Sequence, residues 1–249
     1  MESDETLLKR RFTELAERSA NSGIYTFTEF LAPAEKSILE KTVHGIPYGF
    51  FGGYDSAEKE IAYFGSLEIC GYDPVLPITF LKIEPASMKF SEELAHRDFL
   101  GAIMSLGIKR NTLGDLLVKD NICYTVCLEN MADYICENLL SIKRTSILCS
   151  KIEALPDDII PKPVESSFVI TSERFDSVIS SIYKLSRSES QGFFEHEKVF
   201  VGGIPVTNYS HSPKSGDIIT VRGKGKFIYC GIERETKKGR LRCIAKIYK

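Results

Sequence analysis

At 249 residues, 43% hydrophobic and 27% charged, the chain has a globular composition with room for one large domain or two to three small ones. No apolar run reaches the roughly 18 residues that a membrane-spanning helix needs, and the charged N-terminus has no signal-peptide core. The seven cysteines include no Cys-x-x-Cys pair, which argues against a disulfide framework or a zinc knuckle. We therefore expect a cytoplasmic α+β protein with reduced thiols, no membrane partner, and no metal or small-molecule cofactor.

The first 74 residues are expected to form an N-terminal α/β segment. Apolar residues recur at helical spacing near the start, at Leu8, Phe12, Leu15 and Ala16. A second helix is predicted to begin near Pro33. Aromatic strands on either side of a turn rich in Gly and Asp then predict a hairpin within residues 48–65.

Residues 75–155 read as strand, helix, strand, strand, helix, strand, which is the ferredoxin-like split βαβ arrangement. The strands are predicted at residues 77–83, 114–118, 121–128 and 144–152, with helices from Ser91 to Leu106 and from Met131 to Leu140. RNA-recognition domains share this order, but residues 121–128 offer only Tyr124 in place of the aromatic signature that stacks RNA bases. The predicted fold alone therefore does not make this domain an RNA binder.

A linker is predicted at residues 156–167, where prolines and paired aspartates interrupt all periodicity. Residues 168–249 form the last predicted domain, and this part of the chain is basic. From Val164 onward there are 15 Lys and Arg residues against 9 Asp and Glu residues, a net charge of +6, whereas the preceding 163 residues have a net charge of −8. The asymmetry favours a polyanionic partner, although a solvated basic surface would explain it equally well.

The last domain is expected to begin with a helix whose apolar face contains Phe175, Val178, Ile179 and Ile182. Ser186 and Glu189 then have the spacing of a capping box at the start of a second helix. Arg187 is harder to explain, because a cation at a helix start opposes the helix dipole. Helix-start amides combined with an arginine are suited to holding phosphate, so we interpret Arg187 as a ligand-binding residue.

Hairpins are expected to complete this domain. Two glycines at 202–203 predict the turn of a hairpin, and a second glycine-containing loop carries Arg222, Lys224 and Lys226. The final strand alternates apolar residues with Arg240, Arg242 and Lys246, so one face should pack on the core while the cations point outward.

Residues 174–221 resemble the alpha-L RNA-binding motif, the fold named after the fourth small-subunit ribosomal protein. The resemblance is carried, in order, by "RFD" at 174–176, "SRS" at 186–188, "VFVGG" at 199–203 and "GDII" at 216–219. The chain departs from the motif at Gly202, where asparagine is usual, and at Glu197, where glycine is usual. Glu197 adds negative charge beside the expected RNA face and should soften the affinity.

The whole chain resembles the YlmH-like proteins of Gram-positive bacteria and cyanobacteria, through His96–Val118, Arg144–Ile147 and Val221–Phe227. This resemblance implies no catalysis and a C-terminal domain that binds ribosomal RNA and tRNA. It further implies a role on large ribosomal subunits blocked by peptidyl-tRNA, in rescue or quality control.

The predicted RNA-binding residues are Arg174, Ser186, Arg187, Ser188, Gln191, Lys198, Arg222, Lys224 and Lys226. The predicted secondary contacts in the middle domain are Lys109, Arg110, Lys143 and Arg144. Replacing Arg174 and Arg187 together is expected to weaken RNA binding with almost no change in thermal stability.

We predict no catalytic residue. "HRD" at 96–98 resembles a kinase catalytic loop, but Ile103 stands where that loop needs asparagine. The glycine-containing loops fit neither a P-loop nor a dinucleotide fingerprint. Two other functions remain open at this point: an RNA-modifying enzyme of the pseudouridine synthase or methyltransferase type, and a cell-division adaptor.

Overall fold

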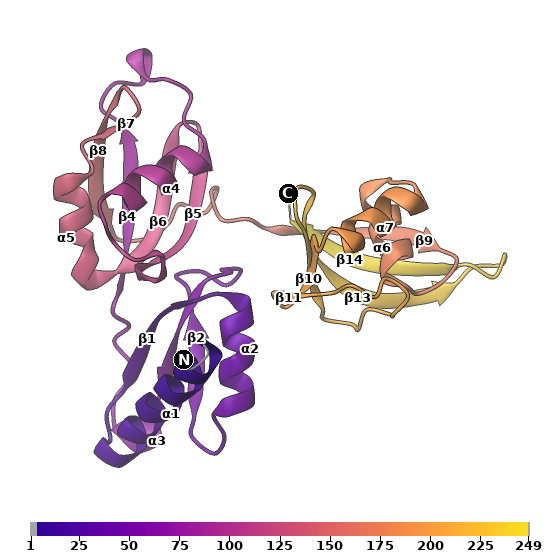
Figure 1. The fold of residues 1–249 in the computed structure, drawn as a ribbon, viewed down its shortest axis with the longest axis horizontal. Coiled ribbons are helices and arrows are strands. Elements are labelled where there is room, and N and C mark those ends of the chain that lie inside the picture. Colours follow the sequence, from indigo (N-terminus) through magenta and orange to yellow (C-terminus); the bar gives the residue numbers. More distant parts are fainter. Residues whose placement is uncertain (1–3, 249) are drawn as a thin grey trace. The chain divides into compact units, whose positions relative to one another are not determined.

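The computed structural model describes residues 4–248 and divides the chain into two compact units, with the boundary between Ile160 and Pro161. Both units combine helices with antiparallel sheets, which confirms the α+β class (Figure 1). None of the helices in the described part of the chain is long and apolar enough to cross a membrane.

The N-terminal segment is a three-stranded antiparallel sheet in the order β1-β3-β2, packed against two helices. Its elements are α1 (Asp4–Ser22), β1 (Thr26–Leu31), α2 (Pro33–Thr42), β2 (Tyr48–Phe51), β3 (Glu60–Phe64) and the short α3 (Leu67–Cys70). Phe12 and Leu15 of α1 pack with Leu39 of α2 and Phe64 of β3 in one buried cluster, as the helical periodicity predicted.

The next block has the strand order β5-β6-β4-β8-β7 with antiparallel pairing throughout, and its first four strands have the split βαβ order. Its elements are β4 (Ile78–Pro85), α4 (His96–Ser105), β5 (Leu113–Lys119), β6 (Ile122–Leu128), α5 (Glu129–Asn138), β7 (Ser141–Ile142) and β8 (Thr145–Ile152). Phe99 and Ile103 of α4 and Ile135 of α5 pack with Leu81 and Ile83 of β4, so both helices cover the same face of the sheet.

The predicted start of α4 at Ser91 is wrong, because the helix begins five residues later at His96. The Asn121 side chain donates to the carbonyl of Glu92 and accepts from the amide of Leu94, which holds this stretch outside the helix. The Asp98 carboxylate then accepts from the Ala95 amide at 2.8 Å and caps the helix start. Helix α5 is likewise displaced, and begins at Glu129 directly after β6 rather than at Met131.

The face of this sheet that α4 and α5 leave open is covered by the N-terminal segment. Phe30, Tyr54 and Ile61 are buried together with Val126 of β6. The Tyr54 hydroxyl donates to the Asp115 carboxylate of β5 at 2.8 Å. Residues 1–160 therefore share an apolar core, and the boundary that we expected between residues 74 and 75 falls inside one packed unit.

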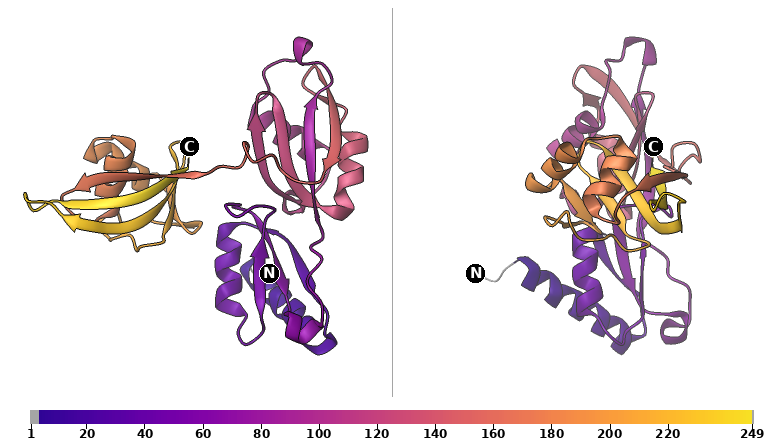
Figure 2. Two further views of the ribbon diagram at one scale, coloured as in Figure 1. Left: turned by 180° about the vertical axis from the view of Figure 1, so that it is seen from behind. Right: turned by 90° about the vertical axis from the view of Figure 1, so that its right-hand side faces the viewer.

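The C-terminal unit is a six-stranded sheet in the order β11-β10-β12-β13-β14-β9. Helices α6 and α7 lie on one face of it (Figure 2). Its elements are β9 (Pro163–Ile170), α6 (Phe175–Tyr183), α7 (Arg187–Glu195), β10 (Val199–Val201), β11 (Ile204–Pro205), β12 (Ile218–Val221), β13 (Gly225–Glu235) and β14 (Leu241–Tyr248). Val178 and Ile179 of α6 and Phe194 of α7 pack on Phe227 and Tyr229 of β13.

Residues 163–167, which we assigned to the linker, belong to strand β9. This strand pairs with β14 along its whole length, from Ile170 opposite Leu241 to Pro163 opposite Tyr248. The prolines misled the prediction, because proline is tolerated at the first residue of an edge strand, where no ladder amide is needed.

Candidate nucleic-acid interface

The start of α7 has the predicted capping box. The Glu189 amide donates to the Ser186 hydroxyl at 3.2 Å, and the Glu189 carboxylate accepts from the Ser186 amide at 2.8 Å. The hydrogen bond from the Ser186 side chain lowers the pKa of Glu189 below its ordinary value. Ser186 therefore completes the helix end, while Ser188 is exposed beside it.

Asp176, in the first turn of α6, is the residue that sequence reasoning missed. Its side chain is fully buried, with 0% exposure, and it collects donors from two helices. Arg174 donates to both carboxylate oxygens, at 3.1 and 2.9 Å, and Gln191 of α7 donates at 3.0 Å. Arg187 lies 3.4 Å from the same carboxylate. The only sequence signal for Asp176 was its place in "RFD". That tripeptide supported the resemblance to the alpha-L motif, but no role was assigned to the Asp176 carboxylate.

This geometry corrects the interpretation of Arg187. The cation at the start of α7 already has a counter-charge inside the protein, so its position does not by itself require an external ligand. Burial alone would raise the pKa of Asp176, but the hydrogen bonds from Gln191 and Arg174 and the nearby arginine charges lower it below its ordinary value. Arg174 is mainly a structural residue, whereas the Arg187 side chain is 65% exposed and keeps donors free for solvent or a ligand.

We expect the lowered pKa of Asp176 to make the C-terminal unit sensitive to acid. An Asp with a folded-state pKa below its unfolded value of about 3.9 stabilises the fold above that pH and loses the contribution as the pH falls through the folded value. The unfolding free energy of the parent should therefore approach that of Asp176→Asn as the pH falls from about 5 to 2.5 in denaturant titrations. A difference between the two proteins that stayed constant over this range would contradict the prediction.

Two predicted cations, Lys198 and Lys224, lie near the two ends of α7 and come from the segments that follow it. The Arg222 amide donates to the Lys198 carbonyl at 2.9 Å, which joins the end of α7 to the β12–β13 turn. The charge of Lys224, in that turn, contributes to lowering the pKa of Glu189, so Lys224 lies near the α7 start. The turn depends on glycine, because Gly223 has a φ of +81°. Lys224 thus accompanies the Ser186–Ser188 segment, whereas Lys198 follows the other end of α7.

Lys226 is separated from this group by the pleat of the sheet. Its neighbour Phe227 is buried under the helices, so Lys226 projects from the opposite face, where its ammonium lies 4.5 Å from the centre of the Tyr248 ring. Arg222 lies on the opposite face with Lys226, because its guanidinium is 4.4 Å from the ring of Phe200, whose neighbour Val199 is buried under the helices. We define the α7 interface as Ser186, Arg187, Ser188, Lys198 and Lys224.

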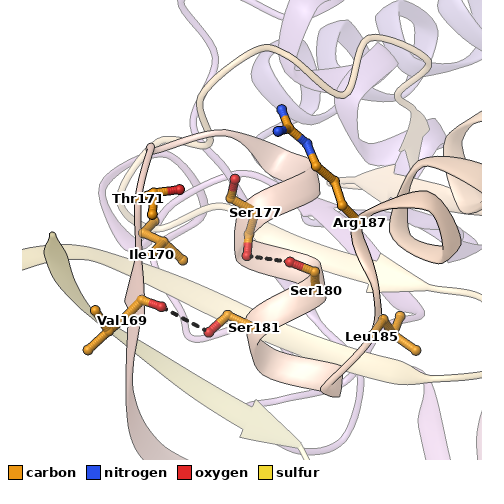
Figure 3. A pocket seen from close by; sticks show the side chains of 8 residues that line it. All are labelled: Val169, Ile170, Thr171, Ser177, Ser180, Ser181, Leu185 and Arg187. Atoms are coloured by element: carbon orange, nitrogen blue, oxygen red, sulfur yellow. Dashed lines mark hydrogen bonds between the residues drawn. The ribbon is translucent and has the colours of Figure 1, made fainter.

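An open pocket of about 330 Å³ adjoins the α7 interface (Figure 3). Arg187 stands at its edge, and serine hydroxyls of α6 line it. The Ser180 hydroxyl donates to the Ser177 carbonyl at 3.0 Å and the Ser181 hydroxyl to the Val169 carbonyl at 3.4 Å. Since these protons are used, the hydroxyls offer acceptor lone pairs to a donor such as a ribose hydroxyl.

Three of the four predicted secondary contacts have partners within the protein. Arg110 donates to the backbone carbonyls of Leu113 and Gly114, and so holds its own turn together. Lys143 lies 2.8 Å from Asp98, and Arg144 pairs with Glu92 at 3.1 Å. Lys109 is exposed. A role in RNA contact remains a prediction for these residues.

The face of the middle sheet that an RNA-recognition domain would use for base stacking is covered. Tyr124 and Phe80 lie on it, but both pack against the cluster that contains Phe30 and Tyr54. Bases could not stack there without removing the N-terminal segment. Any RNA contact of the middle domain would therefore use its loops and helix ends.

Two thiols of β6 and His196 lie in structural surroundings. Cys123 and Cys127 are fully buried in β6, and burial raises the pKa of Cys127 to about 12. Among residues 4–248, no group of three His, Cys, Asp or Glu side chains could hold a metal ion. The His196 ring donates from Nδ1 to the Gly192 carbonyl at 2.7 Å, and His196 ends α7.

Residues 77–155 match the family described as "Putative RNA-binding domain in YlmH". A relative from Bacillus subtilis (strain 168), named ribosome-associated protein quality control protein P2, is 28% identical over 218 residues, which cover 86% of this chain and 84% of the relative. The solved structure of cell division protein ylmH from Streptococcus pneumoniae has a similar fold, with a TM-score of 0.50 at 18% identity, over 61% of this chain and 93% of that one.

Over residues 77–155 this chain resembles the RNA-binding domain of YlmH, and over most of its length it resembles the Bacillus subtilis relative. The resemblance predicted from His96–Val118 and Arg144–Ile147 is confirmed, and both YlmH-like stretches lie inside the matched segment. The alpha-L motif at residues 174–221 remains a prediction.

Proposed function

We propose that this chain is an RNA-binding protein of the ribosome, and that its C-terminal unit contacts RNA through the α7 interface. The observation that carries the proposal is that Lys224 and the exposed part of Arg187 lie at the start of α7, with Lys198 after its other end. Helix-start amides, hydroxyls and cations form the combination that holds phosphate oxygens.

The chemistry of the α7 interface favours recognition of RNA shape over sequence. A-form RNA hides its base edges in a deep groove and exposes phosphates and 2′-hydroxyls. The α7 interface supplies donors for phosphates, and the adjoining serine pocket supplies acceptors for hydroxyls. None of the residues that define the α7 interface is aromatic, so it offers no ring on which a single-stranded base could stack. We therefore infer structured ribosomal RNA or tRNA as the target.

The finer part of the proposal is a role on large ribosomal subunits that carry peptidyl-tRNA, in rescue or quality control. It is supported by the name of the Bacillus subtilis relative, which is a ribosome-associated quality control protein. The description of the family matched by residues 77–155 also supports RNA binding.

Replacing Lys198 and Lys224 with alanine should weaken binding to ribosomal RNA by about 10-fold near 100 mM salt. Each lost phosphate contact should also reduce the slope of log K against log salt by about 0.7 to 0.9, so the double variant should lose roughly 1.5. Fluorescence anisotropy with labelled RNA over a salt series measures both quantities. Arg11→Ala/Arg18→Ala, on the exposed face of α1, is the matched control because it removes the same charge. Equal slopes for the two double variants would rule out the α7 interface.

Sedimentation of cell extract through a sucrose gradient tests the finer part. We expect the protein in the large-subunit fractions, with the Lys198→Ala/Lys224→Ala variant shifted to the top of the gradient. A signal confined to small subunits or to free protein would reject the rescue role and leave general RNA binding.

If ribosomal RNA incubated with the protein and a methyl donor became modified, the RNA-modifying alternative would replace the proposal.

A further inference from the structure

The turn of the β13–β14 hairpin lies beyond the ends of the strands on either side of it. Strand β12 ends its pairing with β13 at Ile228, and β9 ends its pairing with β14 at Leu241. The tip of the hairpin, residues 236–240, therefore has no neighbouring strand and projects from the end of the unit (Figure 1). We call residues 232–242 the hairpin arm.

The tip of the arm has a defined turn. The Thr236 amide donates to the Arg240 carbonyl at 2.7 Å, and the Gly239 amide donates to the Thr236 carbonyl at 2.9 Å. Gly239 has a φ of +71°, the left-handed conformation that closes a short hairpin loop with glycine at low cost. Lys237 and Lys238 occupy the turn and are exposed, so the fold presents them at a fixed outer point.

The arm concentrates positive charge that the fold does not use. Between residues 234 and 242 there are five basic residues and one acidic residue. Arg234 stands directly opposite Arg242 in the ladder, and like charges in that position destabilise a sheet. The Glu233 carboxylate forms an ion pair with the Arg242 guanidinium at 2.9 Å. The other four cations of the arm form no ion pair in the described structure: Arg234, Lys237, Lys238 and Arg240. A cationic arm of this kind is suited to an anionic partner.

We propose that the hairpin arm is a second RNA contact, which binds the phosphates of the same duplex about one helical turn from the α7 interface. Lys224 lies at one end of β13 and the tip at the other, because β13 runs from Gly225 to Glu235. Eleven residues at roughly 3.3 Å each separate the two by about 35 Å. One turn of B-form DNA is about 34–36 Å, and the shorter rise of A-form RNA makes the same distance slightly more than one turn of an RNA duplex. The inference rests on the proposed function, since it assigns a second part of the same RNA to the arm.

The composition of the tip favours phosphate over a membrane or a protein. Residues 236–240 contain no apolar side chain, so the tip cannot insert into lipid as interfacial anchors do. They also lack the aromatic anchors that dominate protein interfaces. Lysines on a rigid ribbon instead resemble the backbone contacts that position a protein on a duplex.

Duplex length is the variable that tests this geometry. A duplex of about 16 base pairs, the length that double-stranded RNA-binding domains span, can reach both contacts, whereas one of about 6 base pairs can reach only one. The parent should bind the longer duplex with a steeper salt slope. Lys237→Ala/Lys238→Ala should lower that slope by about 1.5 and weaken binding about 10-fold at low salt, with no change for the short duplex.

Lys198→Ala/Lys224→Ala provides the comparison that separates the two proposals. If the arm variant binds the long duplex like the parent while the α7 variant does not, the arm is not a contact and the α7 interface stands. If neither variant affects any duplex, the proposed function fails as well. Loss of binding to both lengths in the arm variant would contradict a contact one turn away. Titration with anionic lipid vesicles in place of RNA should show no arm-dependent binding, and arm-dependent vesicle binding would overturn the choice of RNA.

Discussion

The Arg174→Ala/Arg187→Ala variant should have a markedly less stable C-terminal unit, with an unfolding free energy lower by about 3–5 kcal/mol. Asp176 is fully buried, and these two arginines are the charges that face it. Removing both leaves a buried carboxylate with only Gln191 and a backbone amide as donors. Denaturant unfolding of the full chain, followed by a probe in the C-terminal unit, measures the loss. This expected loss of stability replaces the expectation from the sequence, which was that the thermal midpoint of the variant would hardly change.

Asp176→Asn in the same background is the control. If an uncompensated charge causes the loss, neutralising Asp176 should restore part of the stability that the two arginine substitutions remove. An unchanged unfolding midpoint in the double arginine variant would show that Asp176 does not depend on them. Because the variant is expected to be destabilised, a loss of RNA binding in it would not identify an RNA contact.

Phe30→Ala should destabilise the whole of residues 1–160, by about 3–5 kcal/mol. The Phe30 side chain has 0% exposure and belongs to the cluster that joins the N-terminal segment to the middle sheet. Its fit is tight, because a Cβ added to Gly114 would lie 2.9 Å from the Phe30 ring. Probes placed in the N-terminal segment and in the middle sheet should therefore lose structure at the same, lower denaturant concentration.

Phe90→Ala is the matched control for this prediction. Phe90 is 79% exposed, and its removal should change stability by less than about 0.5 kcal/mol. Two separate transitions in Phe30→Ala, with the middle sheet unaffected, would show that the N-terminal segment and the split βαβ domain unfold independently.

Local patterns along the chain predicted most of the elements. The apolar spacing of Phe175, Val178 and Ile179 predicted α6, and the Ser186–Glu189 spacing predicted the cap of α7. These signals work because each depends on residues close together in sequence, where spacing determines which side chains meet.

The failures of prediction depended on distant residues. The position of α4 is set by Asn121, which lies 27 residues after the amide that it binds. The role of Asp176 depends on Gln191, 15 residues later. The predicted linker was too long, because β9 is identified as a strand only by its pairing with β14, more than 70 residues away. Sequence periodicity does not predict such long-range pairings.

The pairing of β9 with β14 also has a consequence for synthesis. The first strand of the C-terminal unit to leave the translating ribosome lies beside the last one, so the sheet cannot be completed until almost the whole chain has emerged. Pairings this distant in sequence form slowly, because loop closure must precede the contact. Residues 1–160 have no such dependence and can fold while the rest is still being made. A nascent chain truncated before Leu241 should therefore contain a folded N-terminal unit followed by an incomplete, protease-sensitive sheet.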